Sequence, residues 1–349
     1  MKPITALAAV PEALDIEDSR ALLVWLRAHG HLAPGETPRC TNLHGGVSNR
    51  TVLVERFSGE AWVLKQALEK LRVAADWHSD PRRIHREAHG LRWLARLAPP
   101  GAITPLLFDD HAQHLLAMKA VPEPHENWKT MLLDHEPDVS HVRQFGGLLG
   151  TIHRRSAEKR ETIAVEFDDR SFFESLRLEP YYRHTAAQHP AMRAFFDGLI
   201  AETLATRAAL VHGDYSPKNI LVHRGQLVLL DHEVIHFGDP AFDVGFSLTH
   251  LLSKARHRPA QRAAFLEAAR LHWRTYAATA GGVADAPGFA SRAVRHTLGC
   301  QLARVDGRSP LEYLTAAERD HQRRDALELM SQPPANVPAL IDSFARRLE

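Results

Sequence analysis

Residues 211–222, VHGDYSPKNILV, contain the pattern of apolar and polar residues from which the fold of this chain can be inferred. Apolar residues stand at both ends of it, and Asp214 and Asn219 lie between them. A second apolar run, 227–230, ends directly before Asp231. Short buried strands of this kind place the polar residues that follow them on neighbouring loop ends. We therefore expect Asp214, Asn219 and Asp231 to form one polar site.

These three side chains are of the types that phosphoryl transfer uses. One carboxylate can orient an attacking hydroxyl, while an amide oxygen and a second carboxylate hold a magnesium ion that bridges the nucleotide phosphates. This chemistry needs hard oxygen ligands rather than imidazoles. A single Asp after an apolar strand more often caps a turn, so the prediction depends on the order of several pieces between residues 211 and 243.

With these pieces in order, the sequence resembles the aminoglycoside phosphotransferase and choline kinase family, the small-molecule branch of the protein-kinase-like fold. The resemblance covers residues 43–247 and is most specific over 211–243. It implies that Asp214 is the catalytic base. It also implies that Asn219 and Asp231 bind magnesium.

Two further acidic residues take their roles from the same resemblance. The order Asp231-His232-Glu233 is closer to the Asp-x-Glu form of choline and methylthioribose kinases than to that of the aminoglycoside enzymes. It implies that Glu233 assists the metal or the acceptor. Residues 238–243, GDPAFD, match a family segment in which the last Asp, here Asp243, braces the catalytic loop through hydrogen bonds.

The N-terminal half contains the groups with which a kinase holds phosphates. Residues 45–50, GGVSNR, lie between two predicted strands, where glycines let backbone amides approach phosphate oxygens. Lys65 ends the next predicted strand, and Glu87 lies on the predicted helix 84–97. In order and spacing they look like the family's Lys and Glu ion pair, with Lys65 reaching the alpha and beta phosphates. The nucleotide-binding candidates in the turn are Gly45, Gly46, Ser48 and Asn49.

The resemblance also implies an α+β, two-lobed protein-kinase-like fold. The strand that ends at Met118 falls where the family's hinge binds adenine, which implies backbone contacts at Met118 and Ala120. Residues 121–124, VPEP, cannot continue a helix or a central strand. We therefore expect a mainly β nucleotide-binding lobe over 1–120, and a mainly α lobe with the catalytic and acceptor sites over 121–349.

Twenty-three histidines against two cysteines raise the alternative of a histidine-ligated metal. Residues 232–236, HEVIH, match the zinc-protease pattern through His232, Glu233 and His236. That pattern needs a helix, so that both imidazoles share one face. Here it follows a strand-like run, contains two β-branched residues and continues into Gly238, which argues against a zinc hydrolase.

Other histidines receive structural interpretations. His85 and His89 stand at i and i+4 on the predicted helix 84–97, and we interpret them as a solvated helix face because no third ligand is near in sequence. His212, in the catalytic loop, is expected to hold that loop through a hydrogen bond. His153, at the end of a predicted helix, is also expected to be structural.

The composition of the 349-residue chain excludes several classes of function. Forty-three Lys and Arg against 42 Asp and Glu leave a formal net charge of +1, which would not draw the chain to nucleic acid or to an acidic membrane. Two cysteines cannot build a disulfide framework, so we expect a cytoplasmic protein. No apolar run approaches the roughly 20 residues of a membrane span. We expect a monomer or homodimer with a small-molecule substrate.

The acceptor pocket in this family is built by C-terminal helices. Residues 251–349 hold 15 Lys and Arg against 10 Asp and Glu, which argues against a polycationic aminoglycoside and leaves neutral or anionic alcohols. Arg304 and Arg308 lie in the polar stretch 304–310 and are candidates to reach the acceptor or a phosphate. The alternative is an Arg and Asp pair that braces a turn between helices.

The sequence thus predicts ATP- and Mg²⁺-dependent phosphorylation of a hydroxyl group on a small metabolite, such as a sugar or an amino alcohol. A catalytically inactive nucleotide-binding regulator of the same fold is the alternative, and it ranks lower because all the expected metal ligands are present. Two further alternatives are an aminoglycoside-resistance kinase and a zinc hydrolase that would bind its metal through the pattern of His232, Glu233 and His236.

Overall fold

The computed structural model describes residues 14–43, 46–72 and 77–348. The chain divides into two compact units that are not continuous in sequence. The first consists of residues up to His85 together with Leu106–Ala120, and the second of Arg86–Pro105 together with Val121–Glu349. The first is mainly β and the second mainly α, which confirms the expected fold class. The assignment of nucleotide binding to a lobe over 1–120, and of the catalytic and acceptor sites to a lobe over 121–349, stays a prediction.

The first unit is built on a five-stranded antiparallel sheet in the order β1-β2-β3-β5-β4. Helix α1 (Ser19–Ala28) begins after Asp18, whose carboxylate accepts the N–H groups of the first turn. Leu22 and Leu26, one helical turn apart, enter the same buried cluster as Val52 and Val54 of β2. The strands are β1 (Arg39–Asn42), β2 (Asn49–Glu55), β3 (Ala61–Ala67), β4 (Leu106–Asp110) and β5 (Leu115–Lys119).

The second unit contains two small sheets and most of the helices. The β strands are β6 (His125–Asn127), β7 (Ala209–Val211), β8 (Ile220–His223), β9 (Gln226–Leu229) and β10 (His236–Gly238). The helices are α2 (Arg83–Leu97, which begins in the first unit), α3 (Trp128–Asp134), α4 (Val139–Glu158), α5 (Arg160–Glu166), α6 (Ser171–Phe173), α7 (His184–Gln188), α8 (Arg193–Ala205), α9 (Ala241–His257), α10 (Arg262–Ala280), α11 (Phe289–Asp306), α12 (Ala316–Ser331) and α13 (Val337–Leu348). A π-helix, Glu174–Arg183, connects α6 to α7.

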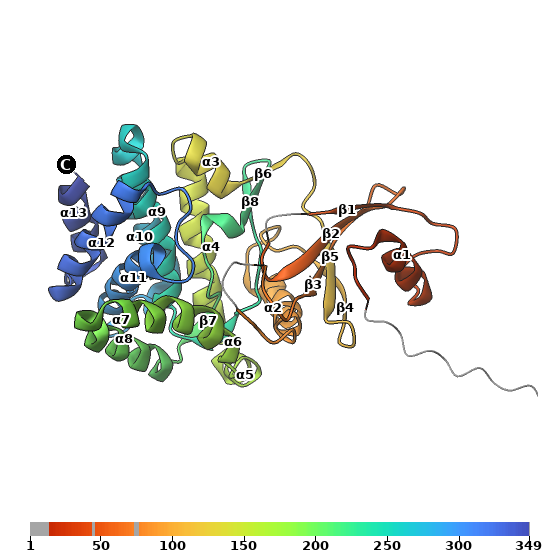
Figure 1. Ribbon diagram of the computed structural model, residues 1–349, viewed down its shortest axis with the longest axis horizontal. Coiled ribbons are helices and arrows are strands. Elements are labelled where there is room, and N and C mark those ends of the chain that lie inside the picture. The colour runs from red at the N-terminus through yellow and green to blue at the C-terminus, as the bar shows by residue number, and fades with distance from the viewer. Residues whose placement is uncertain (1–13, 44–45, 73–76, 349) are drawn as a thin grey trace, which may run out of the picture. The chain divides into compact units, whose positions relative to one another are not determined.

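The core of the second unit is a set of closely packed helices, α4, α9, α10 and α11 (Figure 1). Glycines let the helix backbones approach one another. A Cβ on Gly146 of α4 would lie 2.6 Å from the carbonyl oxygen of His272 in α10, and a Cβ on Gly245 of α9 would lie 2.4 Å from the Cβ of His296 in α11. These contacts set the position of α9, whose first turn lies next to the loop from His212 to Asn219.

None of the helices over the described part of the chain is both long enough and apolar enough to cross a membrane.

Replacing Gly245 by alanine should destabilise the second unit. The new Cβ would also lie 2.7 Å from the backbone nitrogen of Thr297, so α9 and α11 would have to move apart. Overpacking of this kind costs about 1–3 kcal/mol, which urea unfolding would measure. Gly198→Ala in α8 is the matched control, because nothing lies within 4 Å of its Cβ and alanine favours a helix by about 0.5–1 kcal/mol. Unchanged stability of Gly245→Ala would contradict the packing.

Candidate active site

Two strand pairs bring the loops of the candidate site together. β7 pairs with β10, and β8 pairs with β9, both antiparallel. The loop from His212 to Asn219 connects β7 to β8, and a second loop that begins at Asp231 connects β9 to β10. The N–H of Leu230 donates to the carbonyl of Asn219 at 2.9 Å. The end of the first loop therefore lies beside the start of the second.

Asp214 is buried, and two donors hold its carboxylate. The side-chain amide of Asn219 donates to Oδ2 at 2.8 Å and to the backbone carbonyl of Asp214 at 3.0 Å. The guanidinium of Arg177 lies 3.0 Å from the same Oδ2 and donates to the carbonyl of Gly213 at 2.7 Å. Both donors thus fix one carboxylate oxygen. Asn219 uses its NH₂ group in this contact, which leaves its amide oxygen available as an acceptor.

Arg177 was not found by the sequence analysis. It lies on the π-helix, which contains Pro180 and has no motif around it. Burial lowers the pKa of Arg177, but the negative charges of Asp214, Glu233 and Asp231 outweigh burial, and the net shift is upward. One buried guanidinium therefore interacts with three carboxylates.

Asp231 has an unusual backbone conformation for a non-glycine residue. Its φ of 67° falls in the left-handed region, which aspartate tolerates better than most side chains. Strain of this kind persists where the surrounding structure imposes it, often at functional sites. Glu233 follows in a turn and is buried. The second loop thus contributes two acidic side chains.

Asp243, in the first turn of α9, binds the loop from His212 to Asn219 directly. It is fully buried and accepts the N–H groups of His212 at 2.7 Å and Gly213 at 2.8 Å. His153 lies 3.2 Å from the same carboxylate and contacts the hydroxyl of Tyr276 at 2.9 Å. Burial raises the pKa of Asp243, but the hydrogen bonds and charges of His153 and His212 outweigh it, so the net shift is downward.

Gly213 and His212 complete the loop. Gly213 has a φ of 77°, and a Cβ there would lie 2.8 Å from the Val234 side chain, so this position needs glycine. The Nε2 atom of His212 lies 3.1 Å from the carbonyl of Leu230, and its Nδ1 atom accepts the N–H of Asp214. This pattern assigns the proton to Nε2. The imidazole therefore links the two loops.

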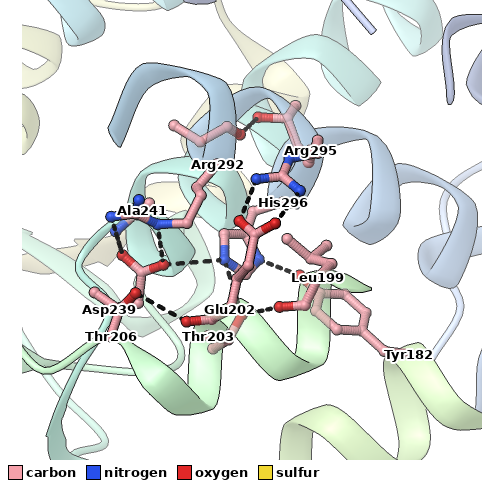
Figure 2. A network of polar contacts seen from close by, with 12 residues as sticks. Tyr182, Leu199, Glu202, Thr203, Thr206, Asp239, Ala241, Arg292, Arg295 and His296 are labelled. Carbon is pink, nitrogen blue, oxygen red and sulfur yellow. Dashed lines mark hydrogen bonds and ion pairs between the residues drawn. The ribbon is translucent and has the colours of Figure 1, made fainter. Parts of the chain in front are cut away.

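A second buried aspartate, Asp239, anchors the segment before α9, as Figure 2 shows. The guanidinium of Arg292 donates to it at 2.7 Å, and its other oxygen accepts the N–H of Ala241 at 3.1 Å. His296 lies 3.8 Å from Asp239 and bonds the hydroxyl of Tyr182 at 2.7 Å. Burial raises the pKa of Asp239, but His296 and Arg292 outweigh it, so the pKa is lowered. Sequence analysis assigned no role to this network.

The predicted nucleotide-binding residues lie in different places. Lys65 lies on β3 opposite Leu116 of β5, in the first unit. Glu87 is fully buried on α2, in the second unit. Met118 is buried on β5, and the N–H of Ala120 donates to the carbonyl of Ala61 at 2.9 Å. Ala120 could therefore offer a base its carbonyl oxygen rather than its N–H.

Part of the glycine-rich turn lies within the described residues. Gly45 lies outside them, whereas Gly46 is exposed and Ser48 and Asn49 are buried. Asn49 donates from its side-chain amide to the hydroxyl of Ser48 at 3.1 Å. The fully buried Arg83 donates to the carbonyl of Ser48, which ties the turn to the start of α2.

The structure places the two acceptor candidates differently. Arg304 is 8% exposed near the end of α11 and donates to the carbonyl and hydroxyl of Ser309 at 2.8 and 3.0 Å. Arg308 is exposed and contacts His184 at 3.5 Å. Asp306 pairs with Arg323 at 2.6 Å. The pair that braces this region therefore involves α12, and neither candidate is part of it.

The zinc-protease pattern lacks the helix that it needs. Residues 233–234 form a turn, and His236 begins strand β10. Among the described residues, His85, Asp109 and His111 of the first unit form the one trio of metal-ligating groups within 4.8 Å of one another. The rings of His85 and His111 are stacked face to face at 3.9 Å, an arrangement in which their nitrogens do not converge on one point.

The interpretation of His85 and His89 as a solvated helix face was wrong. His85 is partly buried against the β4–β5 turn, where its Nε2 atom lies 3.1 Å from His114, and burial lowers its pKa to about 4. His89 lies 2.8 Å from Glu166 and stacks on Phe167. Tertiary contacts therefore cover both imidazoles.

Much of the histidine excess belongs to the interior of the second unit. Seven histidines there are at most 4% exposed: His153, His212, His232, His236, His250, His272 and His296. Burial lowers the pKa of His236 to about 4 and that of His272 to about 3. His272 contacts the hydroxyl of Ser247 at 2.8 Å. These two imidazoles are neutral parts of the core.

Buried neutral histidines should make the fold sensitive to acid. Folded His272 stays neutral, whereas the unfolded side chain gains a proton below its ordinary pKa of 6.5. The contribution of His272 to the unfolding free energy is therefore constant above pH 6.5 and is lost as the pH falls below 6.5. When the pH is lowered from 7 to 5, the unfolding free energy of the wild type should fall by about 2 kcal/mol more than that of His272→Gln. Exposed His135→Gln is the control, with wild-type pH dependence. Equal slopes for all three proteins in urea unfolding would contradict this.

Comparison with known proteins identifies sequence relatives of this chain. The profile described as "Phosphotransferase enzyme family" matches residues 39–281. A methylthioribose kinase of Pectobacterium carotovorum is 26% identical over 254 residues, and the match spans 62% of this chain and 62% of that protein. A methylthioribose kinase of Pectobacterium atrosepticum matches over the same length at 25% identity.

Solved structures share the fold at lower sequence identity. The choline kinase of Cryptosporidium parvum is 10% identical, covers 94% of this chain and 99% of its own, and superposes with a TM-score of 0.54. The macrolide 2'-phosphotransferase of Brachybacterium faecium is 21% identical, covers 90% of this chain and 99% of its own, and has a TM-score of 0.51. These likenesses support the protein-kinase-like architecture.

Proposed function

We propose a function from a fact that the comparisons establish: this chain belongs to the phosphotransferase enzyme family. Its function is the transfer of a phosphoryl group from ATP, with Mg²⁺, to a hydroxyl group of a small molecule. The observation that carries this proposal is the fixed carboxylate of Asp214, which Asn219 and Arg177 hold through one oxygen beside the loop of Asp231.

Asp214 has the geometry of a base that orients a hydroxyl. Because Asn219 and Arg177 both bond Oδ2, we assign Oδ1 to the acceptor hydroxyl. Oδ1 takes the proton of this hydroxyl as the new O–P bond forms and the bond between the γ-phosphorus and the β,γ-bridging oxygen of ATP breaks, with ADP as the leaving group. Asp243 holds the backbone of His212 and Gly213 and so fixes the direction from which Asp214 approaches. Catalysis then depends mainly on positioning and on neutralisation of charge.

The donor set fits a magnesium ion. The amide oxygen of Asn219 and the carboxylate of Asp231 are hard ligands of the kind that Mg²⁺ prefers, and Glu233 would assist them. The three carboxylates that interact with Arg177 leave a net negative charge there, which favours a cation. When bound, Mg²⁺ would supply positive charge that neutralises the nucleotide phosphates.

The nucleotide-binding candidates take their proposed roles from the family. Lys65 would hold the alpha and beta phosphates, with Glu87 as its family partner, and Gly45, Gly46, Ser48 and Asn49 would contribute the turn above the phosphates. The backbone at Met118 and Ala120 would bind adenine. Support comes from the order of these residues along the chain and from the family to which it belongs.

The first acceptors to test follow from the relatives. Methylthioribose comes first, because two methylthioribose kinases match the chain at 26% and 25% identity. Other sugars and amino alcohols complete the panel, with release of ADP as the measurement. ATP binding without phosphorylation of any alcohol would favour a nucleotide-binding regulator over an enzyme.

Asp214→Asn should abolish most of the turnover. The amide keeps the shape of the side chain but cannot take the proton, and loss of a general base lowers kcat by about 10²- to 10⁴-fold. ADP release with the best acceptor of the panel measures this loss, and the melting temperature confirms that the variant is folded. Full turnover of Asp214→Asn would disprove the mechanism.

Arg177 should act as a positioning residue through Asp214. In Arg177→Met both the contact with Asp214 and the hydrogen bond to Gly213 are lost, and displacement of a catalytic group by about 1 Å can lower the rate by about 10²-fold. We expect kcat to fall while the KM for ATP stays within twofold, and Arg177→Lys to recover part of kcat because it keeps the charge. A loss confined to the KM for ATP would contradict this role.

A further inference from the structure

A buried cationic cluster lies in the second unit, apart from the carboxylates around Arg177. We define it as Lys129 of α3, His250 and Lys254 of α9, Arg304 of α11, and Tyr313, which follows α11. Lys254 is fully buried, His250 is 4% exposed and Arg304 is 8% exposed. Buried charges of one sign are costly unless an opposite charge accompanies them.

Two acidic groups near this cluster, Glu312 and Glu318, are already engaged, and Glu318 pairs with His257 at 3.1 Å. Glu312 forms an ion pair with Lys129, and its side chain is 66% exposed. Arg304 bonds Ser309, and its Nη2 atom lies 3.3 Å from Nε2 of His250, so its polar contacts are with neutral groups. Lys254 lies 5.1 Å from the ring centroid of Tyr313, a contact with an aromatic face.

Three buried donors of the cluster lack a hydrogen-bond partner among the described residues. They are the Nζ atom of Lys254, the hydroxyl of Tyr313 and the Nε atom of Arg304. Most buried polar groups in folded proteins are paired, so each orphan calls for an explanation. An ammonium, a phenol and a guanidinium near one another have in common that they all donate to an anion.

The charges support the same conclusion. Burial lowers the pKa of Lys254 to about 7, with further lowering by the positive charges of Lys129 and Arg304 and opposition from Glu312. Burial also lowers the pKa of His250, followed by the positive charges of Arg304 and Lys254. Positive charge therefore exceeds negative charge around His250 and Lys254.

The cluster lies one aromatic ring away from the proposed base. The guanidinium carbon of Arg304 lies 5.0 Å from the ring centroid of Tyr181, and that of Arg177 lies 5.9 Å from the same centroid. Arg177 in turn contacts Asp214 at 3.0 Å. The ring of Tyr181 therefore places the cluster close to the guanidinium that holds the proposed base.

We propose that the cationic cluster binds an anionic group, a phosphate or a carboxylate, of the acceptor. The acceptor is then an alcohol that already carries negative charge, rather than a neutral sugar or a polycation. This inference rests on the proposed function, because it names the substrate class of that site. Lys254, Arg304 and Tyr313 supply the donors, and Lys129 adds charge at the exposed side.

Direct binding of an anion tests the cluster without any turnover. Inorganic phosphate, compared with chloride at equal ionic strength, should raise the melting temperature of the wild type. Lys254→Met should be as stable as the wild type or more stable without phosphate, because it removes an unpaired buried charge, and it should lose the phosphate-dependent rise. Arg274→Gln, on the exposed face of α10, is the matched control and should keep the rise. A wild type without the rise, or a Lys254→Met variant that keeps it, overturns the proposal.

Matched pairs of acceptors then identify the source of the anion. Ribose is compared with ribose 5-phosphate, and glycerol with glycerate, through ADP release. Where either member of a pair is phosphorylated, we expect the anionic member to have at least a tenfold higher kcat/KM. In Lys254→Met and Arg304→Gln, the KM for the anionic member should rise at least tenfold, while the KM for ATP stays unchanged. A rise in the KM for ATP alone would assign the cluster to the nucleotide and overturn the proposal, as would a preference for the neutral members.

The two proposals fail in different ways. If no alcohol of any kind is phosphorylated while phosphate still binds in a Lys254-dependent manner, the proposed kinase activity fails and the anion site stands as a binding site alone. If methylthioribose or another neutral alcohol is phosphorylated efficiently and Lys254→Met does not change its KM, the kinase activity stands and the anionic acceptor is wrong.

Discussion

The carboxylate of Asp243 is the interaction on which the candidate site depends. It is fully buried at the start of α9 and accepts the backbone N–H groups of His212 and Gly213 in the first loop of the candidate site. A carboxylate in such a place is stable only because these donors and His153 outweigh the cost of burial. The loop can then hold Gly213 in a left-handed conformation and present Asp214. The close packing of α9 against α11 at Gly245 keeps the carboxylate where the loop needs it.

Charge in the second unit is separated into two regions. Asp214, Asp231 and Glu233 interact with the single guanidinium of Arg177, whereas Lys254 and Arg304 lie in a region where positive charge dominates. The ring of Tyr181 contacts both guanidinium groups. Such an arrangement suits a reaction in which the acidic region binds a cation that accompanies the phosphates and the positive region binds an anionic acceptor. Each region then has the charge opposite to that of its own ligand.

The histidines show how composition and structure answer different questions. A count of 23 indicates a metal site when it is taken alone. In the structure, seven of them are buried in the second unit, and they contact partners such as Asp243, Ser247 and Tyr182. A neutral imidazole can donate and accept one hydrogen bond each, so it can join polar groups inside a core without bringing charge. These buried histidines include several that form internal hydrogen bonds.

The fold class and the family could be inferred from the sequence alone, together with the residues at the two loops of the candidate site. These features depend on short-range spacing: apolar runs that form β7, β8 and β9 leave Asp214, Asn219 and Asp231 at the ends of adjacent loops. Only the tertiary structure identified Arg177, Lys254 and the pairing of His85. Their partners come from segments far away along the chain. The local sequence around a buried basic residue does not indicate whether that residue contacts a carboxylate, an aromatic ring or another imidazole.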